Sequence, residues 1–278
     1  MTRNRLTRSG VVLALVAALV SAPTAAFAQS DEQPTRDTRV TDERPRDERP
    51  ADRHADGLEA AKRHALAAIA RRLATIEQLR GAIGRNRHVT EDHASALQRD
   101  LADAASGLAE LARKIEAAET AEELRPLVES IVVDFRIYVL VVPKVHEVLA
   151  SDTLLAVASH FDRSADKLGQ IIARAEEAGL EVGEAKRLLG EMRDLIAAAE
   201  RTAGPVAGSV IGLQPGDWPD PAKGLLRAGK DSLHEAAGNL RAAHRAGVDI
   251  VKILRELIGG HDRTDVAHDR ATDGARDV

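Results

Sequence analysis

Asp134-Phe135-Arg136-Ile137-Tyr138-Val139-Leu140-Val141-Val142-Pro143-Lys144 is the densest apolar run of the chain after its N-terminus. Its β-branched residues from Ile137 to Val142 fit a buried β-strand as well as a helix. The sequence offers no second strand candidate, and an unpaired strand would leave its backbone groups without hydrogen bonds. We therefore predict a central helix with a kink or a break near residues 139–143, because a proline inside a helix costs about 3 kcal/mol.

The composition around this run favours helices throughout. The chain has 278 residues with 44% hydrophobic but only 2% aromatic residues, so its core has to be built from Ala, Leu, Val and Ile. Alanine, leucine, arginine and glutamate are all good helix formers. We predict an all-α fold, an elongated antiparallel bundle of five or six long helices with a central helix kinked near Pro143.

Apolar residues recur at spacings of three and four before the central run, which places them on one helix face. The stripes run from Leu58 to Ile83 and from Leu97 to Ile115, and the short loop between them predicts an antiparallel hairpin. Thr90 and Thr120 are predicted N-caps, each followed by acidic residues in the first turn. The helix that Thr120 opens is expected to continue into the central run.

The second half of the chain repeats this organisation. A seven-residue apolar pattern between 155 and 175 predicts coiled-coil-like packing, and Gly179 is placed to end that helix. Asp152 is interpreted as an N-cap or an exposed polar turn. A further helix is expected to fray at Gly204-Pro205, followed by a loop over 204–222 and a last helix that starts at Asp220-Pro221 and stops at Gly259-Gly260.

The two ends differ in composition from this helical domain, which is predicted over 56–260. Residues 1–28 have a basic start, an apolar stretch and Ala26-Phe27-Ala28, a pattern typical of a signal peptide cleaved after Ala28. Residues 29–55 are charged and rich in proline, and 261–278 are polar, so both are predicted to be disordered. We expect a secreted or extracytoplasmic protein without an integral membrane span after cleavage.

Several chemistries lack support in the sequence. Cysteine is absent. The chain has ten histidines, but no Glu-x-x-His or zinc-protease pattern occurs, and neither does a nucleophile elbow or a phosphate loop. His88 and His93 flank a turn and are interpreted as surface histidines. The net charge is −5, or −8 without the three arginines of residues 1–28, which argues against nucleic acid as a partner. We predict no catalytic residue, metal or cofactor.

The charges inside the central run allow two interpretations. Asp134, Arg136 and Lys144 are expected to pair with one another or with Asp152 and Asp162 across helices. Alternatively they form the polar rim of a pocket opened by the kink, which would bind a lipid or another apolar ligand. The loop around Trp218 would be a lid in that case, and a loop anchored on the bundle otherwise. The candidate ligand or interaction site comprises Arg136, Tyr138, Pro143, Lys144 and Trp218.

The central run, with Asp152 downstream, resembles a signature in uncharacterised secreted helical proteins of actinobacteria. The resemblance covers roughly residues 58–258 and implies an extracellular helical bundle, with no activity and no site residues attached. The function we expect is non-enzymatic: a structural or protein-interaction role in the cell envelope or outside the cell, as a homo-oligomer or with an envelope protein. The alternative is a carrier of a lipid or other apolar ligand.

Overall fold

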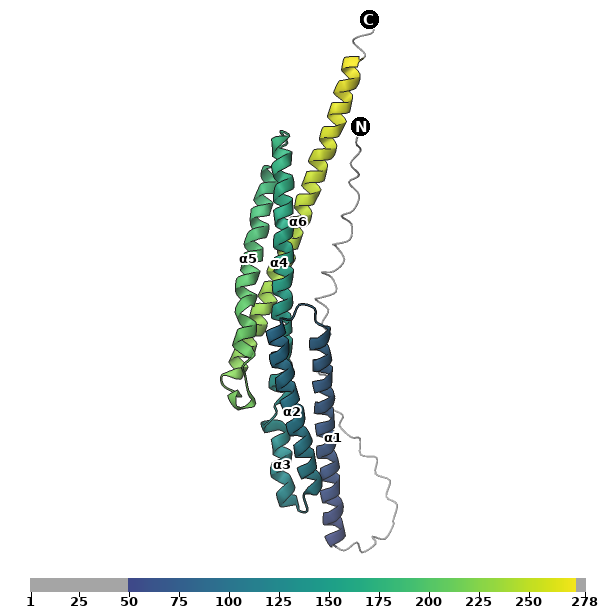
Figure 1. Cartoon of the computed structure of the whole chain (residues 1–278), viewed down its shortest axis with the longest axis vertical. Coiled ribbons are helices and arrows are strands. Elements are labelled where there is room, and N and C mark those ends of the chain that lie inside the picture. Colours follow the sequence, from purple (N-terminus) through teal and green to yellow (C-terminus); the bar gives the residue numbers. More distant parts are fainter. Residues whose placement is uncertain (1–49, 274–278) are drawn as a thin grey trace, which may run out of the picture. The chain divides into compact units, whose positions relative to one another are not determined.

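The computed structural model describes residues 50–273, in which every regular element is a helix and no strand occurs (Figure 1). The all-α prediction is confirmed. The predicted signal peptide, most of the predicted linker and residues 274–278 lie outside the described residues. The elements are α1 (Pro50–Arg85), α2 (Glu91–Ala117), α3 (Ala121–Val133), η2 (Ile137–Val141), α4 (Val142–Glu177), α5 (Gly183–Val210), η3 (Pro215–Asp217) and α6 (Ala222–Asp273).

Helices α2 and α3 begin where the sequence predicts, whereas α1 begins at Pro50, inside the predicted disordered linker. The Thr90 hydroxyl accepts a hydrogen bond from the His93 N–H, and the Thr120 hydroxyl accepts one from the Glu123 N–H, both at 3.2 Å. Each bond satisfies a backbone donor that the first helical turn leaves free. Helices α1, α2 and α3 pack on one another, which confirms the predicted α1–α2 hairpin.

The central run is not one kinked helix, so this part of the prediction is wrong. Helix α3 ends at Val133, the chain turns at Arg136 in the left-handed conformation (φ 43°, ψ 38°), and the π-helical turn η2 leads directly into α4. Pro143 lies in the first turn of α4, directly after η2. The break therefore lies at residues 134–136 and no kink at Pro143 is confirmed.

The second half differs from the prediction at its loop. Helix α5 continues through Gly204-Pro205 to Val210, so the connection to α6 covers only 211–221. Helix α6 begins at Ala222 and passes the predicted end at Gly259-Gly260. Gly179 has φ +81°, which confirms it as the residue that ends α4, because other residues rarely adopt this conformation.

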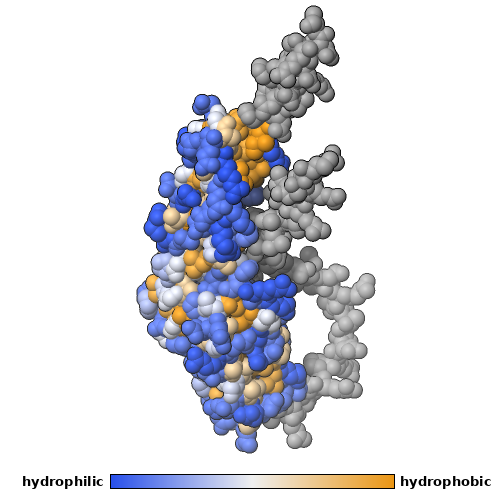
Figure 2. Space-filling view, turned by 45° about the horizontal axis from the view of Figure 1, so that its top comes forward, coloured by the Kyte–Doolittle hydropathy of each residue, from blue (hydrophilic) through white to orange (hydrophobic). Residues whose placement is uncertain are grey.

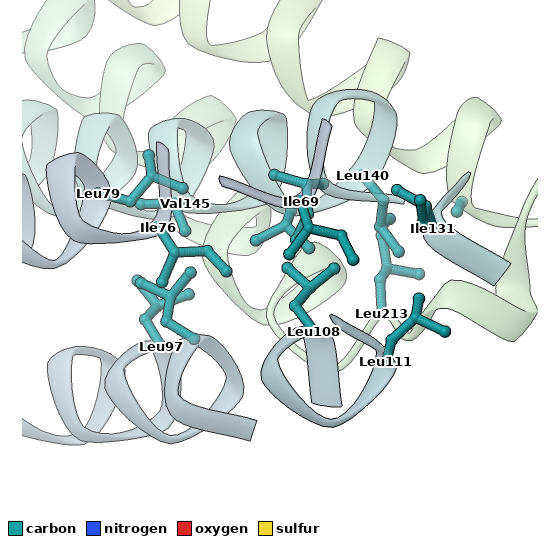
Figure 3. Packing of buried hydrophobic residues seen from close by; sticks show 14 of the residues in the cluster. Ile69, Ile76, Leu79, Leu97, Leu108, Leu111, Ile131, Leu140, Val145 and Leu213 are labelled. Carbon is teal, nitrogen blue, oxygen red and sulfur yellow. The ribbon is translucent and has the colours of Figure 1, made fainter. Parts of the chain in front are cut away.

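Helix α4 takes part in two sets of contacts. Its first turns belong to the large apolar cluster of α1, α2, α3 and η2, together with Leu213 and the adjoining ends of α5 and α6, and Figure 3 shows these aliphatic side chains directed into one interior. Its remaining length packs on α5 and α6. The apolar residues that α4 buries on this side follow the predicted seven-residue pattern: Ala158, Phe161, Ala165, Ile172 and Ala175. Coiled-coil geometry stays a prediction.

Gly229 of α6 lies against Glu147 of α4. A Cβ at this position would overlap the Glu147 carboxylate and lie 3.2 Å from Val206 Cγ1, whereas a Cβ at Gly238 of the same helix would meet no atom within 4 Å. Gly229→Ala should lower the free energy of unfolding by about 2 kcal/mol through overpacking. Gly238→Ala should raise it by about 0.5–1 kcal/mol, because alanine favours helix.

Urea unfolding followed by circular dichroism measures both variants against the parent chain. An equal effect of the two substitutions would contradict close packing of α4 on α6 at Gly229.

Candidate functional site

Four buried polar or charged residues follow one another along the first turns of α4. They are Lys144, Glu147, Ser151 and Asp152, with exposed fractions of 2%, 8%, 0% and 5%. Spacings of three and four residues place Lys144, Glu147 and Ser151 on one side of the helix. Buried polar groups are costly unless they are bonded, so their partners show what this α4 polar cluster does.

Lys144 joins three parts of the chain. Its ammonium donates to Asp100 Oδ2 of α2 at 2.5 Å and to the Leu213 carbonyl at 2.9 Å. Asp100 is part-exposed, with 30% of its side chain accessible, whereas the Lys144 side chain is 3% accessible. The expected pairing with Asp134, Asp152 or Asp162 is therefore wrong, but the expectation that this interior charge has a partner is met.

Two residues of the central run, Arg136 and Lys144, bind the loop between α5 and α6. Arg136 Nε donates to the Pro215 carbonyl at 3.1 Å, close to the Leu213 carbonyl that Lys144 binds. Trp218 is half-buried and packs against the apolar cluster. These contacts match the interpretation of the Trp218 loop as a loop anchored on the bundle.

Asp152 connects α4 to the start of α2. It accepts the Thr90 N–H at 2.9 Å with Oδ2, and the His93 ring nitrogen Nδ1 lies 2.9 Å from the same oxygen. Asn86 Nδ2 donates to the Thr153 hydroxyl one residue further along α4. The interpretation of Asp152 as an N-cap or an exposed turn is wrong, because it is buried inside α4 and binds the neighbouring loop. His93 is likewise part-buried, not a free surface histidine.

Glu147 and Ser151 face the other helices. The Ser151 hydroxyl donates to the Ala203 carbonyl of α5 at 2.9 Å. Glu147 lies against Gly229 of α6, and its buried Oε2 has no hydrogen-bond partner among the described residues. Burial raises the pKa of the Glu147 carboxyl from 4.5 to about 7, while the positive charge of Lys230 acts in the opposite direction. The carboxyl therefore keeps its proton to a higher pH than an exposed glutamate does.

The chemistry of this cluster is structural. Lys144, Ser151 and Asp152 each have their partners inside the protein, on α2, α5 and the loops. Among residues 56–258 no group of three His, Asp or Glu side chains is arranged to hold a metal ion. The cluster therefore fixes α4 against its neighbours, and a surface for an external partner has to be sought elsewhere.

A solvent-open apolar groove runs between α1 and α3. Its volume is about 330 Å³, and we call it the α1–α3 groove. Its lining residues are Ala61, His64, Ala65, Ala68, Arg72, Val128, Ile131 and Val132. Val132 is 55% exposed, and Val128 and Val133 are also exposed. Figure 2 shows one face of the molecule, which is mainly hydrophilic with separate hydrophobic patches.

Arg72 connects the α1–α3 groove to the central run. Its guanidinium carbon lies 5.2 Å from the centre of the Tyr138 ring, which is within the range of a cation–π contact. Nη1 donates to the Ala68 carbonyl of its own helix, whereas the buried Nε has no hydrogen-bond partner in the part of the chain that is described. Tyr138 is 46% exposed beside this contact. The exposed surface thus extends from the groove to Tyr138.

The predicted site residues divide into two groups. Arg136, Lys144 and Trp218 come together around the loop after α5, and Pro143 adjoins Lys144 in the chain, whereas Tyr138 lies beside the α1–α3 groove. The burial of Glu147 was not predicted, although its position three residues after Lys144 places it on the same side of a helix. The groove was also missed, because Val128 and Val132 look like ordinary core positions in the sequence.

No family model, curated protein or solved structure matches this chain. Among residues 50–273, no helix combines the length and the apolar character that a membrane crossing requires. The function has to be inferred from the surface itself.

Lys144 and Lys186 offer a matched test of burial. Each ammonium lies 2.5 Å from a carboxylate oxygen, but both side chains of the Lys186–Glu176 pair are about half exposed. Lys144→Met should lower the free energy of unfolding by about 2–4 kcal/mol, because Asp100 and the Leu213 carbonyl lose a buried donor. Lys186→Met should change it by less than about 1 kcal/mol.

Both free energies come from urea titrations at the same pH and salt concentration. Equal losses in the two variants would contradict a specific role of the Lys144 contacts.

The Glu147 carboxyl predicts a pH dependence of stability. Its pKa is about 7 in the folded protein against an ordinary value of 4.5, so the folded state keeps the proton to higher pH than the unfolded chain. The free energy of unfolding therefore falls as the pH rises from 4.5 to about 7, by up to about 3 kcal/mol at 1.36 kcal/mol per pKa unit. Glu147→Gln removes this loss and should stabilise the protein most above neutral pH.

The measurement is the difference in unfolding free energy between Glu147→Gln and the parent chain, near pH 5 and near pH 8. Glu177→Gln, on the exposed end of the same helix, serves as the control. A difference that does not change with pH in the Glu147 variant would rule out this carboxyl as the source.

Proposed function

We propose that this is an exported, non-enzymatic helical-bundle protein that binds another polypeptide, in the cell envelope or outside the cell, through the α1–α3 groove. The observation that carries this proposal is the exposure of Val128 and Val132 beside an apolar groove. Exposed apolar patches on helical proteins are favoured sites for a partner helix, because burying them on binding removes that surface from water.

The shape of the groove supports a helix as the partner. On α1 the groove is lined by Ala61, Ala65 and Ala68, which are small and recur at spacings of four and three residues. Small side chains along one helix face allow a second helix to approach closely.

Export is proposed from the sequence alone. Residues 1–28 have the basic start, the apolar stretch and the Ala26-Phe27-Ala28 site that a signal peptidase recognises. The absence of cysteine is compatible with an oxidising compartment, since no thiol has to be protected there.

A carrier of an apolar ligand is the second candidate, with its ligand in the same groove. A volume of about 330 Å³ with an apolar lining is at the lower end of the size range of small-molecule sites. In the first candidate function a polypeptide contacts Val132, and in the second a lipid or another apolar ligand does.

A photo-crosslinking amino acid at position 132 distinguishes them in the secreting host. Val248 of α6 is the control position, because it is exposed but lies outside the groove. Mass spectrometry of the products should show a polypeptide attached at position 132 and none at position 248. A lipid at position 132 would favour the carrier, and identical products at both positions would overturn the proposal.

A further inference from the structure

We propose that the polypeptide bound in the α1–α3 groove is a second copy of this chain, related to the first by a twofold axis parallel to α1 and α3. This inference rests on the proposed function and specifies its partner. Each copy would place α3 on α1 of the other copy. The interface would thus be formed by the same residues on both subunits, as a twofold axis requires.

The groove is complementary to itself in shape. Its α1 side is lined by the small residues Ala61, Ala65 and Ala68 together with His64 and Arg72, and on its α3 side Val128 and Val132 are exposed. Both sets line the same groove, so they lie at the same level along the two helices. A twofold axis parallel to the helices keeps that level and brings the valines of each copy onto the alanines of the other.

The charges select this axis over the alternative. Between residues 61 and 72, α1 contains four Lys or Arg and no acidic residue, whereas α3 contains three Glu and one Arg. Lys62 already pairs with Glu59 of its own helix at 3.3 Å, which leaves Arg63 and Arg71 as the exposed cations of this segment. Arg71, Glu122 and Glu129 are exposed. An axis parallel to the helices places the cationic segment of α1 on the acidic α3 of the other copy. An axis perpendicular to them would place α1 on α1 and α3 on α3, with like charges opposed.

The composition of the chain outside the structure argues against a segment of the mature chain in the groove. Residues 29–49 contain Val40 as their one large aliphatic residue, and residues 274–278 contain Val278 alone. Neither segment offers the repeated apolar side chains that would cover Val128 and Val132. A second copy supplies them from α3.

Sedimentation velocity of the chain from Gln29 onward tests the proposal at concentrations up to about 100 μM. The parent chain should form a dimer, and Val128→Glu/Val132→Glu should weaken it at least about 100-fold, because each Glu meets an apolar surface. Ile171→Glu, the same kind of substitution at an exposed position on α4, should leave the dimer unchanged. Circular dichroism confirms that all variants remain helical.

A charge exchange tests the orientation of the two copies. Arg71→Glu and the double variant Glu122→Arg/Glu129→Arg should each weaken self-association about tenfold, and an equimolar mixture should restore the dimer. In that mixture residue 71 of each copy again has the opposite charge to residues 122 and 129 of the other copy. No recovery in the mixture would overturn the parallel axis.

A parent chain that stays monomeric, or a dimer that tolerates both Glu substitutions in α3, would overturn the second copy as occupant. Crosslinking of position 132 to a different polypeptide would then leave the proposed function standing without this inference. A lipid attached at that position in a monomer would overturn both.

Discussion

A buried ammonium group has to be neutralised, and Lys144 meets this constraint with groups from two other parts of the chain. Burying an unpaired charge costs several kcal/mol, so the Asp100 carboxylate of α2 and the Leu213 carbonyl after α5 are held within 2.9 Å of it. This places α2, α4 and the α5–α6 connection together. The next turns of α4 extend the arrangement, since Ser151 bonds to α5 and Asp152 to the start of α2.

This arrangement separates structural polar groups from the surface that remains for a partner. Three members of the α4 polar cluster bind inside the protein, and Glu147 is enclosed against α6. Between α1 and α3, by contrast, small alanines and exposed valines leave an apolar groove. Because this groove is already formed in the unbound chain, a helix that bound there would meet a small ordering cost, as the proposed interaction role requires.

The sequence predicted most of the helices but little of how they meet. Thr90 and Thr120 were identifiable as N-caps because capping depends on residues within one turn. The reversal at Arg136 could not be predicted from neighbouring residues, because a left-handed arginine is unfavourable by itself. Its side chain binds the Pro215 carbonyl, 79 positions away in the sequence. The partners of Lys144 and the groove at Val132 depend in the same way on how separate helices pack, which periodicity does not determine.

The central structural claim is that Lys144 and Asp100 couple α4 to α2, and a double-mutant cycle with Lys144→Met and Asp100→Asn measures this directly. Unfolding free energies of the parent chain, both single variants and the double variant give the coupling energy. We predict about 1–3 kcal/mol of favourable coupling, the range for groups in direct contact inside a protein. Strictly additive losses would contradict the claim and leave α4 positioned by apolar packing alone.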